Sequence, residues 1–198
     1  MVWLWLVVAG VGFGAAAASI AAARHPTIPV WEMRVFRVIN RLPDWLYPTL
    51  WPPMQLGNLV VGTAVGLVAA AVTTDAALGT GVILAMLLKL VTERIVRREM
   101  AAYLTVRERP GTSEPGAILR GDVPPEGPSF PSGHVILVAA VSCVLAPILP
   151  AAWVAFAALC TVLVMVGRVY VGAHNPLDVT AGLGAGLLLG GVLAAFVG

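Results

Sequence analysis

The chain has 198 residues, of which 59% are hydrophobic and only 11% are charged, and its formal net charge at pH 7 is +2. Its mean hydropathy of +0.92 lies far above the range of soluble globular domains. This composition excludes a soluble domain and predicts an integral membrane protein, with the lipid bilayer and not a nucleic acid as its surroundings. We expect a single membrane-embedded domain over residues 1–198, because this length holds several spans and little else.

Six apolar runs follow one another along the chain, at residues 2–23, 57–74, 76–96, 131–149, 151–167 and 176–197. Each has about the 17 to 25 residues that a transmembrane helix requires. The expected fold class is therefore all-α, a polytopic membrane helical bundle with about six transmembrane helices. The first run lacks a basic flank and is too long for a secretory signal, so we expect it to be retained.

The basic residues are distributed unevenly, because the 12 Lys and Arg fall within 24–41, within 89–120 and at Arg168. An even number of crossings places both chain ends on one side and the basic connections on the other. The positive-inside rule assigns the basic side to the cytoplasm. Arginines that bind phosphate would bias that count on either side of the membrane, so the orientation stays open.

Two connections are long enough to have structure of their own. In the segment 24–56, the spacing of Arg34, Arg37 and Arg41 puts all three on one face of a short amphipathic helix in the membrane interface. That face is either a solvated cationic surface or a surface that gathers substrate. The polar segment 97–130, rich in Pro, Gly and Glu, is either a lid or a flexible linker.

Glycines recur at every fourth position in two of the apolar runs: Gly62 and Gly66 in the second, and Gly182, Gly186 and Gly190 in the last. Small residues at this spacing let transmembrane helices approach closely, where lipid offers no hydrophobic drive for association. We assign these glycines to helix packing, with a homo-oligomer through the same faces as a further possibility.

The tetrapeptide Pro131-Ser132-Gly133-His134 leads from the polar connection directly into the fourth apolar run. A helix that begins here presents free amide groups and the positive end of its dipole, which together attract anions. The glycine also permits close approach of the backbone to a ligand. The two interpretations are a phosphate site and a plain serine N-cap beside an interfacial histidine.

A second cluster joins the last two runs and consists of Arg168, His174 and Asp178. Asn175 suits the N-cap and Pro176 the first position of a helix, which brings Asp178 back toward His174. The carboxylate can then hold one ring nitrogen and leave the other as a nucleophile; alternatively it only complements the helix dipole. An arginine at the end of an apolar span is costly unless paired or functional, and its planar fork suits a phosphoryl group.

Lys89 stands alone inside the apolar run 82–91, and a lone intramembrane lysine is a functional candidate by default. Arg97 lies about 80° around an ideal helix from Lys89, so the two cations can converge on one anion. The alternative is that both side chains extend to the membrane interface.

Together these residues resemble the type 2 phosphatidic acid phosphatase (PAP2) superfamily, integral membrane lipid phosphatases related to vanadium-dependent haloperoxidases. The family pattern has three elements, Lys-x6-Arg-Pro, Pro-Ser-Gly-His and Ser-Arg-x5-His-x3-Asp. Residues 131–134 match the second element fully. The third element is represented at the required spacing by Arg168, His174 and Asp178, with Gly167 in place of its serine.

The first element is degenerate, because Val96 stands where the family has arginine and no Arg-Pro pair occurs until 109–110. Either Arg97 or Arg98 takes the role after a local shift, or the arginine of the later pair reaches in from the polar connection. Our expectation from the sequence is that Lys89 and Arg97 form this part of the site.

The resemblance implies a mechanism in which His174 attacks phosphorus and forms a phosphohistidine, while Asp178 stabilises the imidazolium. His134 protonates the leaving oxygen and then activates water. The same resemblance implies that no metal and no cofactor takes part, and that the phosphate is held by Lys89, Arg97, Ser132, Gly133 and Arg168.

A site at bilayer depth favours a phosphate carried by a lipid. By family analogy a polyprenyl phosphate or diphosphate comes first, with phosphatidic acid, phosphatidylglycerol phosphate or a lipid-linked sugar phosphate as alternatives. A phosphotransferase or a non-catalytic headgroup binder or transporter would use the same cations differently. The chain has eleven arginines but one lysine, and it is rich in Ala, Val and Gly. This composition is typical of a GC-rich bacterial genome, so we expect a multi-pass protein of the bacterial inner membrane.

Overall fold

The computed structural model describes residues 2–24, 27–103 and 107–197, and within these ranges it contains helices and no β-strand. The α-helices are α1 (Val2–Ala23), α2 (Val30–Asn40), α3 (Tyr47–Gln55), α4 (Leu59–Val72), α5 (Ala76–Tyr103), α6 (Pro110–Ser113), α7 (Gly133–Leu145), α8 (Ala151–Tyr170) and α9 (Pro176–Val197). Two 3-10 turns, η1 (Asp44–Leu46) and η2 (Ala146–Ile148), precede α3 and follow α7. The predicted all-α membrane bundle is confirmed.

Each of the six predicted runs contains a helix, but the helices differ in their capacity to cross a bilayer. Four of them, α1, α5, α8 and α9, are individually long and apolar enough among the described helices. The segment Asp44–Gln55 and α4 qualify only as a pair, bent by 58° at the short break between them, which makes five spans at most. The remaining helix, α7 with its extension to Ile148, is shorter. The count of six is therefore approximate.

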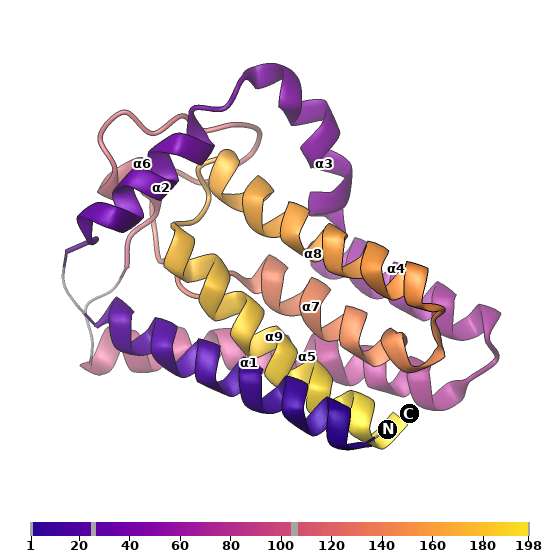
Figure 1. Ribbon diagram of the computed structural model, residues 1–198. Coiled ribbons are helices and arrows are strands. Elements are labelled where there is room, and N and C mark those ends of the chain that lie inside the picture. Colours follow the sequence, from indigo (N-terminus) through magenta and orange to yellow (C-terminus); the bar gives the residue numbers. More distant parts are fainter. Residues whose placement is uncertain (1, 25–26, 104–106, 198) are drawn as a thin grey trace.

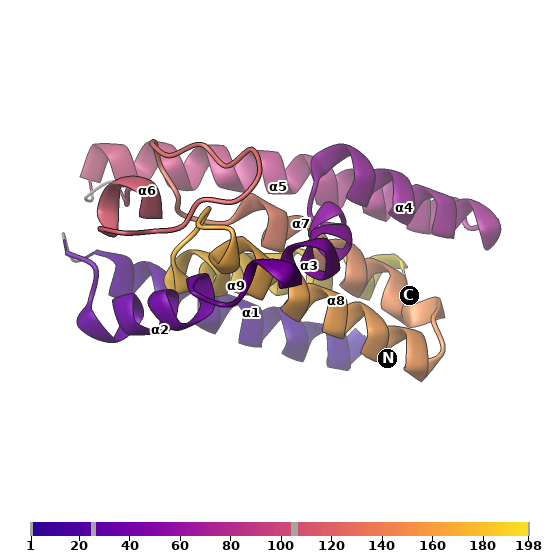
Figure 2. The ribbon, with the colours of Figure 1, turned by 90° about the horizontal axis from the view of Figure 1, so that it is seen from above.

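Different elements of the chain lie at the two ends of the bundle, as Figures 1 and 2 show. Both chain termini lie at one end, together with the α4–α5 and α7–α8 turns. The opposite end holds α2, α6 and the connections that lead into α7 and α9. The connections that carry the Pro-Ser-Gly-His element and the turn before α9 therefore lie at the end away from the termini.

Helix α7 lies in the middle of the bundle and is almost entirely buried, which explains how a short helix can be apolar on every side. It packs against α4, α5, α8 and α9, while α9 also packs along α1. The glycines of α9 make both contacts close. A Cβ atom at Gly186 would lie 2.6 Å from the Cβ of Ala139 in α7, and one at Gly184 would meet the backbone of Ala16 in α1. These glycines thus make close helix contacts within one chain, as the packing interpretation predicts.

Helix α2 runs across the motif end of the bundle and is amphipathic. Its buried face carries Glu32, Phe36 and Asn40, whereas Arg34 and Arg37 are exposed. Because the buried residues recur at every fourth position, one side of the helix faces the bundle and the arginines face outward.

The polar connection after α5 begins later than the sequence indicates, because α5 continues to Tyr103 and the boundary predicted at 97 lies inside it. Farther along, the side chain of Asn40 donates to the carbonyl oxygens of Ile118 and Tyr170, at 2.8 and 2.9 Å. Arg120 donates to the carbonyl oxygens of Asn40 and Tyr170, at 2.8 and 2.7 Å. These contacts fasten the connection to the ends of α2 and α8, which is unlike a free linker.

Candidate active site

The two histidine-bearing motifs meet where α7 and α9 begin. The backbone amide of Ser132 donates to the backbone carbonyl of Asp178 at 3.0 Å. Gly182, one turn farther along α9, permits this approach, because a Cβ atom there would lie 2.7 Å from the carbonyl oxygen of Ser132. Helix packing thus brings the Pro-Ser-Gly-His element against the backbone of Asp178 and Gly182 at the start of α9.

His174 lies in the turn between α8 and α9 and is almost completely buried. Its Nδ1 atom is 3.8 Å from Oδ2 of Asp178, slightly beyond hydrogen-bond distance, and has no hydrogen-bond partner among the described residues. The backbone amide of His174 donates to the carbonyl of Arg168 at 3.3 Å, which fixes the turn. The ring therefore presents Nδ1 to the carboxylate, the arrangement that leaves Nε2 for another partner.

Asn175 does not cap α9 through its side chain as the sequence indicates, because its amide atoms have no partner within the described ranges. Instead Oδ2 of Asp178 accepts a hydrogen bond of 2.8 Å from the backbone amide of Asn175. This is the carboxylate half of a capping box. The contact anchors Asp178 at the start of the helix, close to His174.

Burial lowers the pKa of His174 below its ordinary value of 6.5. The positive charges of Arg168 and Arg109 act in the same direction, while Asp178 opposes them. His174 is therefore neutral at pH 7, and a neutral imidazole retains the lone pair that a nucleophile needs.

A polar cavity of about 270 Å³ opens beside the turn and is lined by His134 and Arg168. Nε of Arg168 is buried and makes no hydrogen bond within the part of the chain that the structure describes. The charges of Arg168 and Arg109 act on both His134 and His174, and Lys89 acts on His134 as well, so the two imidazoles share a cationic surrounding. Other groups around the cavity are Tyr47, Trp51, Gln55, Arg120 and Asp122.

The hydroxyl of Ser132 is fully buried and makes no N-cap hydrogen bond to α7, nor any other among the described residues. The interpretation of Ser132 as a plain N-cap is therefore wrong. A buried hydroxyl at the positive end of a helix dipole can donate to a phosphate oxygen.

Lys89 and Arg97 both lie on α5 and share one carboxylate. Nζ of Lys89 is 2.8 Å from Oε2 of Glu93, and Arg97 pairs with the other oxygen of the same group. Gly133 touches this cluster, since a Cβ atom there would lie 2.8 Å from Cε of Lys89. Lys89 thus reaches the first residue of α7, whereas the side chain of Arg97 stays one-third exposed at 34%.

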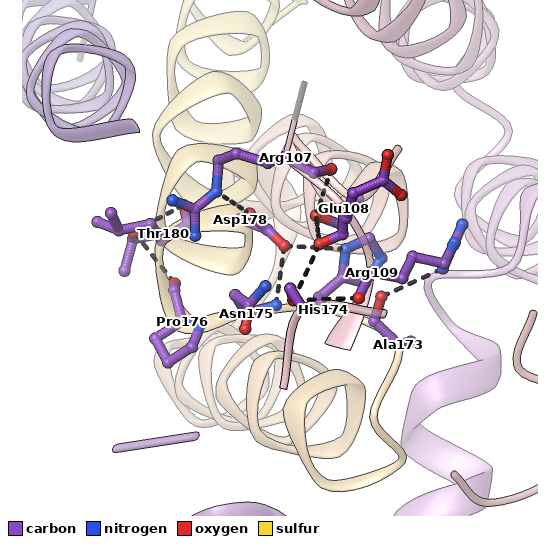
Figure 3. Close-up of polar contacts among 12 residues, drawn as sticks. Arg107, Glu108, Arg109, Ala173, His174, Asn175, Pro176, Asp178 and Thr180 are labelled. Carbon is purple, nitrogen blue, oxygen red and sulfur yellow. Dashed lines mark hydrogen bonds and ion pairs between the residues drawn. The ribbon is translucent and has the colours of Figure 1, made fainter. Parts of the chain in front are cut away.

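Arg109 lies nearer to the turn between α8 and α9 than the sequence indicates. Its Nη1 donates to the backbone carbonyl of Ala173 at 3.1 Å, directly beside His174 (Figure 3). Burial lowers the pKa of Arg109, and the nearby charge of Arg97 acts in the same direction. The signal for this residue was the Arg-Pro pair at 109–110, which the family pattern contains, although at a shorter spacing from Lys89.

Sequence reasoning missed Arg107 and Glu32. Nε of Arg107 donates to Oδ1 of Asp178 at 3.1 Å (Figure 3), and its Nη2 donates to Oε1 of Glu32 at 2.6 Å. Both side chains are buried. Neither belongs to a motif, and nothing in the sequence distinguishes them from other charges in polar connections.

No group of three or more His, Cys, Asp or Glu side chains that could hold a metal ion occurs in residues 2–24, 27–103 and 107–197. The cluster is built from guanidinium, ammonium and imidazole groups instead. Such groups neutralise a phosphate by direct hydrogen bonds.

The fold and the site define a polytopic membrane protein with two imidazoles, a buried carboxylate and several cations at one end of its bundle. The sequence pattern of the PAP2 superfamily matches residues 76–198, and the chain belongs to this superfamily. No curated protein matches the chain.

Two solved structures share the fold. Aquifex aeolicus LpxE is 24% identical with a TM-score of 0.70, over 81% of this chain and 92% of that one. A transmembrane PAP2-type phosphatidylglycerolphosphate phosphatase from Bacillus subtilis is 22% identical with a TM-score of 0.69, over 98% of this chain and 92% of that one. Sequence identities this low establish the shared fold alone.

Proposed function

We propose that the protein is a membrane phosphatase that hydrolyses a lipid phosphate or diphosphate through a phosphohistidine, without a metal ion. One observation carries this proposal. A buried, neutral imidazole at His174 presents Nδ1 to the Asp178 carboxylate at 3.8 Å, inside a cluster of cations that also surrounds His134. Such an arrangement activates a nucleophile and stabilises the charge that develops on phosphorus oxygens.

The first half-reaction forms a bond between His174 Nε2 and phosphorus and breaks the phosphorus–oxygen bond to the lipid. His134 in its protonated form, which a bound phosphate anion favours, gives its proton to the leaving oxygen. Asp178 stabilises the imidazolium of His174. In the second half-reaction His134 removes a proton from water, the water oxygen attacks phosphorus, and the nitrogen–phosphorus bond breaks.

The phosphate oxygens are assigned to Arg168, Lys89, the Ser132 hydroxyl and the Gly133 amide. The unpartnered Nε of Arg168 and Oγ of Ser132 support this assignment. For the arginine of the degenerate first element, the contact of Arg109 with Ala173 favours Arg109 over Arg97, which is partly exposed and paired with Glu93.

A lipid substrate is favoured by two cavities whose linings include neighbouring residues of the chain. Gln55 lines the polar cavity of about 270 Å³, and the next residue, Leu56, lines an apolar groove of about 290 Å³ between α4, α7 and α8. A headgroup and a hydrocarbon chain would fit such a pair. By family analogy a polyprenyl species in the bacterial inner membrane is the first candidate, with phosphatidic acid, phosphatidylglycerol phosphate and a lipid-linked sugar phosphate as alternatives.

The test is a panel of these lipid phosphates, presented in mixed micelles to the purified protein, with free phosphate measured over time. Phosphate release by the wild type and none by His174→Ala would support the proposal. Binding without release by both proteins would favour a headgroup binder or transporter. A phosphorylated acceptor lipid in place of free phosphate would identify a phosphotransferase.

A further inference from the structure

Arg107 lies buried between two carboxylates that come from different parts of the fold. It donates to Asp178 in α9 through Nε at 3.1 Å and to Glu32 in α2 through Nη2 at 2.6 Å. The exposed fraction of its side chain is 3%, and both carboxylates are at 0%. Burying three ionised groups away from water costs desolvation free energy. That cost is offset only when the groups are paired with good geometry, so each of these three side chains stabilises the position of the others.

Glu32 holds more than Arg107. The same oxygen, Oε1, also accepts a hydrogen bond of 2.8 Å from the backbone amide of Leu177, the residue before Asp178. Glu32 therefore fixes both the guanidinium and the first turn of α9. The chain of contacts runs from α2, through the polar connection, to the carboxylate beside His174.

We propose that Arg107, held in place by Glu32, is a positioning residue that keeps the Asp178 carboxylate ionised and directed at Nδ1 of His174. This inference rests on the proposed function, since it assigns a purpose to the geometry around the nucleophile. It concerns two residues that contact neither the phosphate nor the reacting atoms.

The hydrogen bonds of Asp178 support this role. Oδ1 is occupied by Arg107, and Oδ2 accepts from the backbone amide of Asn175 while facing His174. With both oxygens held, the carboxyl group cannot rotate away from the imidazole. Orientation of this kind is what a carboxylate contributes to a histidine nucleophile.

The charge balance supports it as well. Two carboxylates and one guanidinium leave one negative charge, which the imidazolium formed on His174 would neutralise. The charged and titratable groups that act on Asp178 are Glu32 from α2, Arg107 and Arg109 from the polar connection, and His174 from the turn. Burial raises the pKa of Glu32 and Arg107 opposes that shift, so loss of Arg107 would let this pair of carboxylates take up a proton.

The experiment compares Arg107→Gln, Arg107→Lys and Glu32→Gln with a matched control, Glu114→Gln. Glu114 is also a buried glutamate paired with an arginine, Arg37, at 3.4 Å, but it does not belong to the Asp178 chain of contacts. Each variant is purified in detergent, checked for helix content and monodispersity, and assayed for kcat, KM and the pH profile of kcat with the lipid phosphate that the wild type hydrolyses.

We expect Arg107→Gln and Glu32→Gln to lower kcat by about tenfold to a hundredfold, as outer contacts of a reactive group typically do. KM should change by less than about twofold, because neither residue contacts substrate. The acidic limb of the profile should move to higher pH in Arg107→Gln, since loss of the cation favours the protonated carboxyl. Arg107→Lys keeps the charge and should return the acidic limb to its wild-type position, but should recover only part of kcat, because one ammonium nitrogen cannot occupy both positions from which Nε and Nη2 donate.

Folded variants whose kcat and pH profile equal those of Glu114→Gln would overturn the inference. If the Arg107 variants do not fold, Glu32→Gln decides the matter through its kcat and KM. A wild type that releases phosphate from no lipid would instead count against the proposed function, whereas an active wild type with unaffected variants counts against this inference alone.

Discussion

Ser132 and Asp178 are joined through their backbones, by a hydrogen bond of 3.0 Å from the amide of Ser132 to the carbonyl of Asp178. The bond connects the start of α7 to the first turn of α9, and with it the two elements that supply His134 and His174. Because no side chain takes part, the spacing between these elements depends on how closely α7 and α9 pack. That closeness depends in turn on Gly182.

Gly182→Ala should therefore impair the site without altering any proposed catalytic group. The new methyl carbon would lie 2.7 Å from the carbonyl oxygen of Ser132, so backbone must move. Overpacking of this kind costs about 1–3 kcal/mol, and we expect a lower midpoint of thermal unfolding in detergent together with a lower kcat.

The matched control is Gly14→Ala in α1, where a Cβ atom would have nothing within 4 Å. It should leave the unfolding midpoint and kcat close to wild type. If Gly182→Ala had the same unfolding midpoint and kcat as this control, the α7–α9 contact would tolerate a methyl group. The hydrogen bond between Ser132 and Asp178 would then not determine the geometry of the site.

Arg109→Ala should reduce kcat/KM far more than Arg97→Ala. Arg109 donates to Ala173 beside His174, whereas Arg97 is partly exposed and paired with Glu93. Loss of a group that stabilises developing negative charge costs about a hundredfold to a thousandfold in rate. Steady-state kinetics with both variants measures the difference, and a larger loss in Arg97→Ala would restore the assignment expected from the sequence.

His174 should titrate below pH 6.5, because burial lowers its pKa in the folded state. The unfolded chain then binds more protons than the folded one below pH 6.5, so the stability that neutral His174 contributes is fully present above pH 6.5 and is lost as pH falls from 6.5 through the lower pKa of the folded state. Histidine-selective ¹³C NMR in detergent measures the titration, and the chain has only 3 histidines to assign. His174→Gln identifies the resonance by its absence, and a midpoint above 6.5 would contradict the prediction.

Phosphate release should continue unchanged when divalent cations are chelated with EDTA. The charge on the transferring phosphoryl group is matched in our proposal by Lys89, Arg109 and Arg168, which require no metal. The assay compares initial rates before and after chelation, with MgCl₂ restored in a third sample. A rate that falls with EDTA and returns with Mg²⁺ would require a metal-dependent mechanism.

The sequence predicted those features that depend on neighbouring residues. Runs of apolar residues predict the positions of the helices, because a bilayer requires long uninterrupted apolar segments. The end of α5 was missed by two turns, since polar residues such as Arg97 and Arg98 continue a helix beyond the membrane as readily as they end it. Asn175 does precede α9, but its side chain does not cap the helix, because the amide of Leu177, which an N-cap side chain can accept from, donates instead to Oε1 of Glu32 at 2.8 Å.

By itself, the sequence determined that the protein is a helical membrane bundle of the PAP2 type and that His134, His174 and Asp178 stand at one end of it. Hydropathy and short motif spacings are properties of neighbouring residues, so they can be read without a fold. Only the tertiary structure decided that Arg107 contacts both Asp178 and Glu32, and that Arg109 reaches the turn at Ala173. Those contacts join residues far apart in the chain, and their formation depends on how α2, the polar connection and α9 pack together.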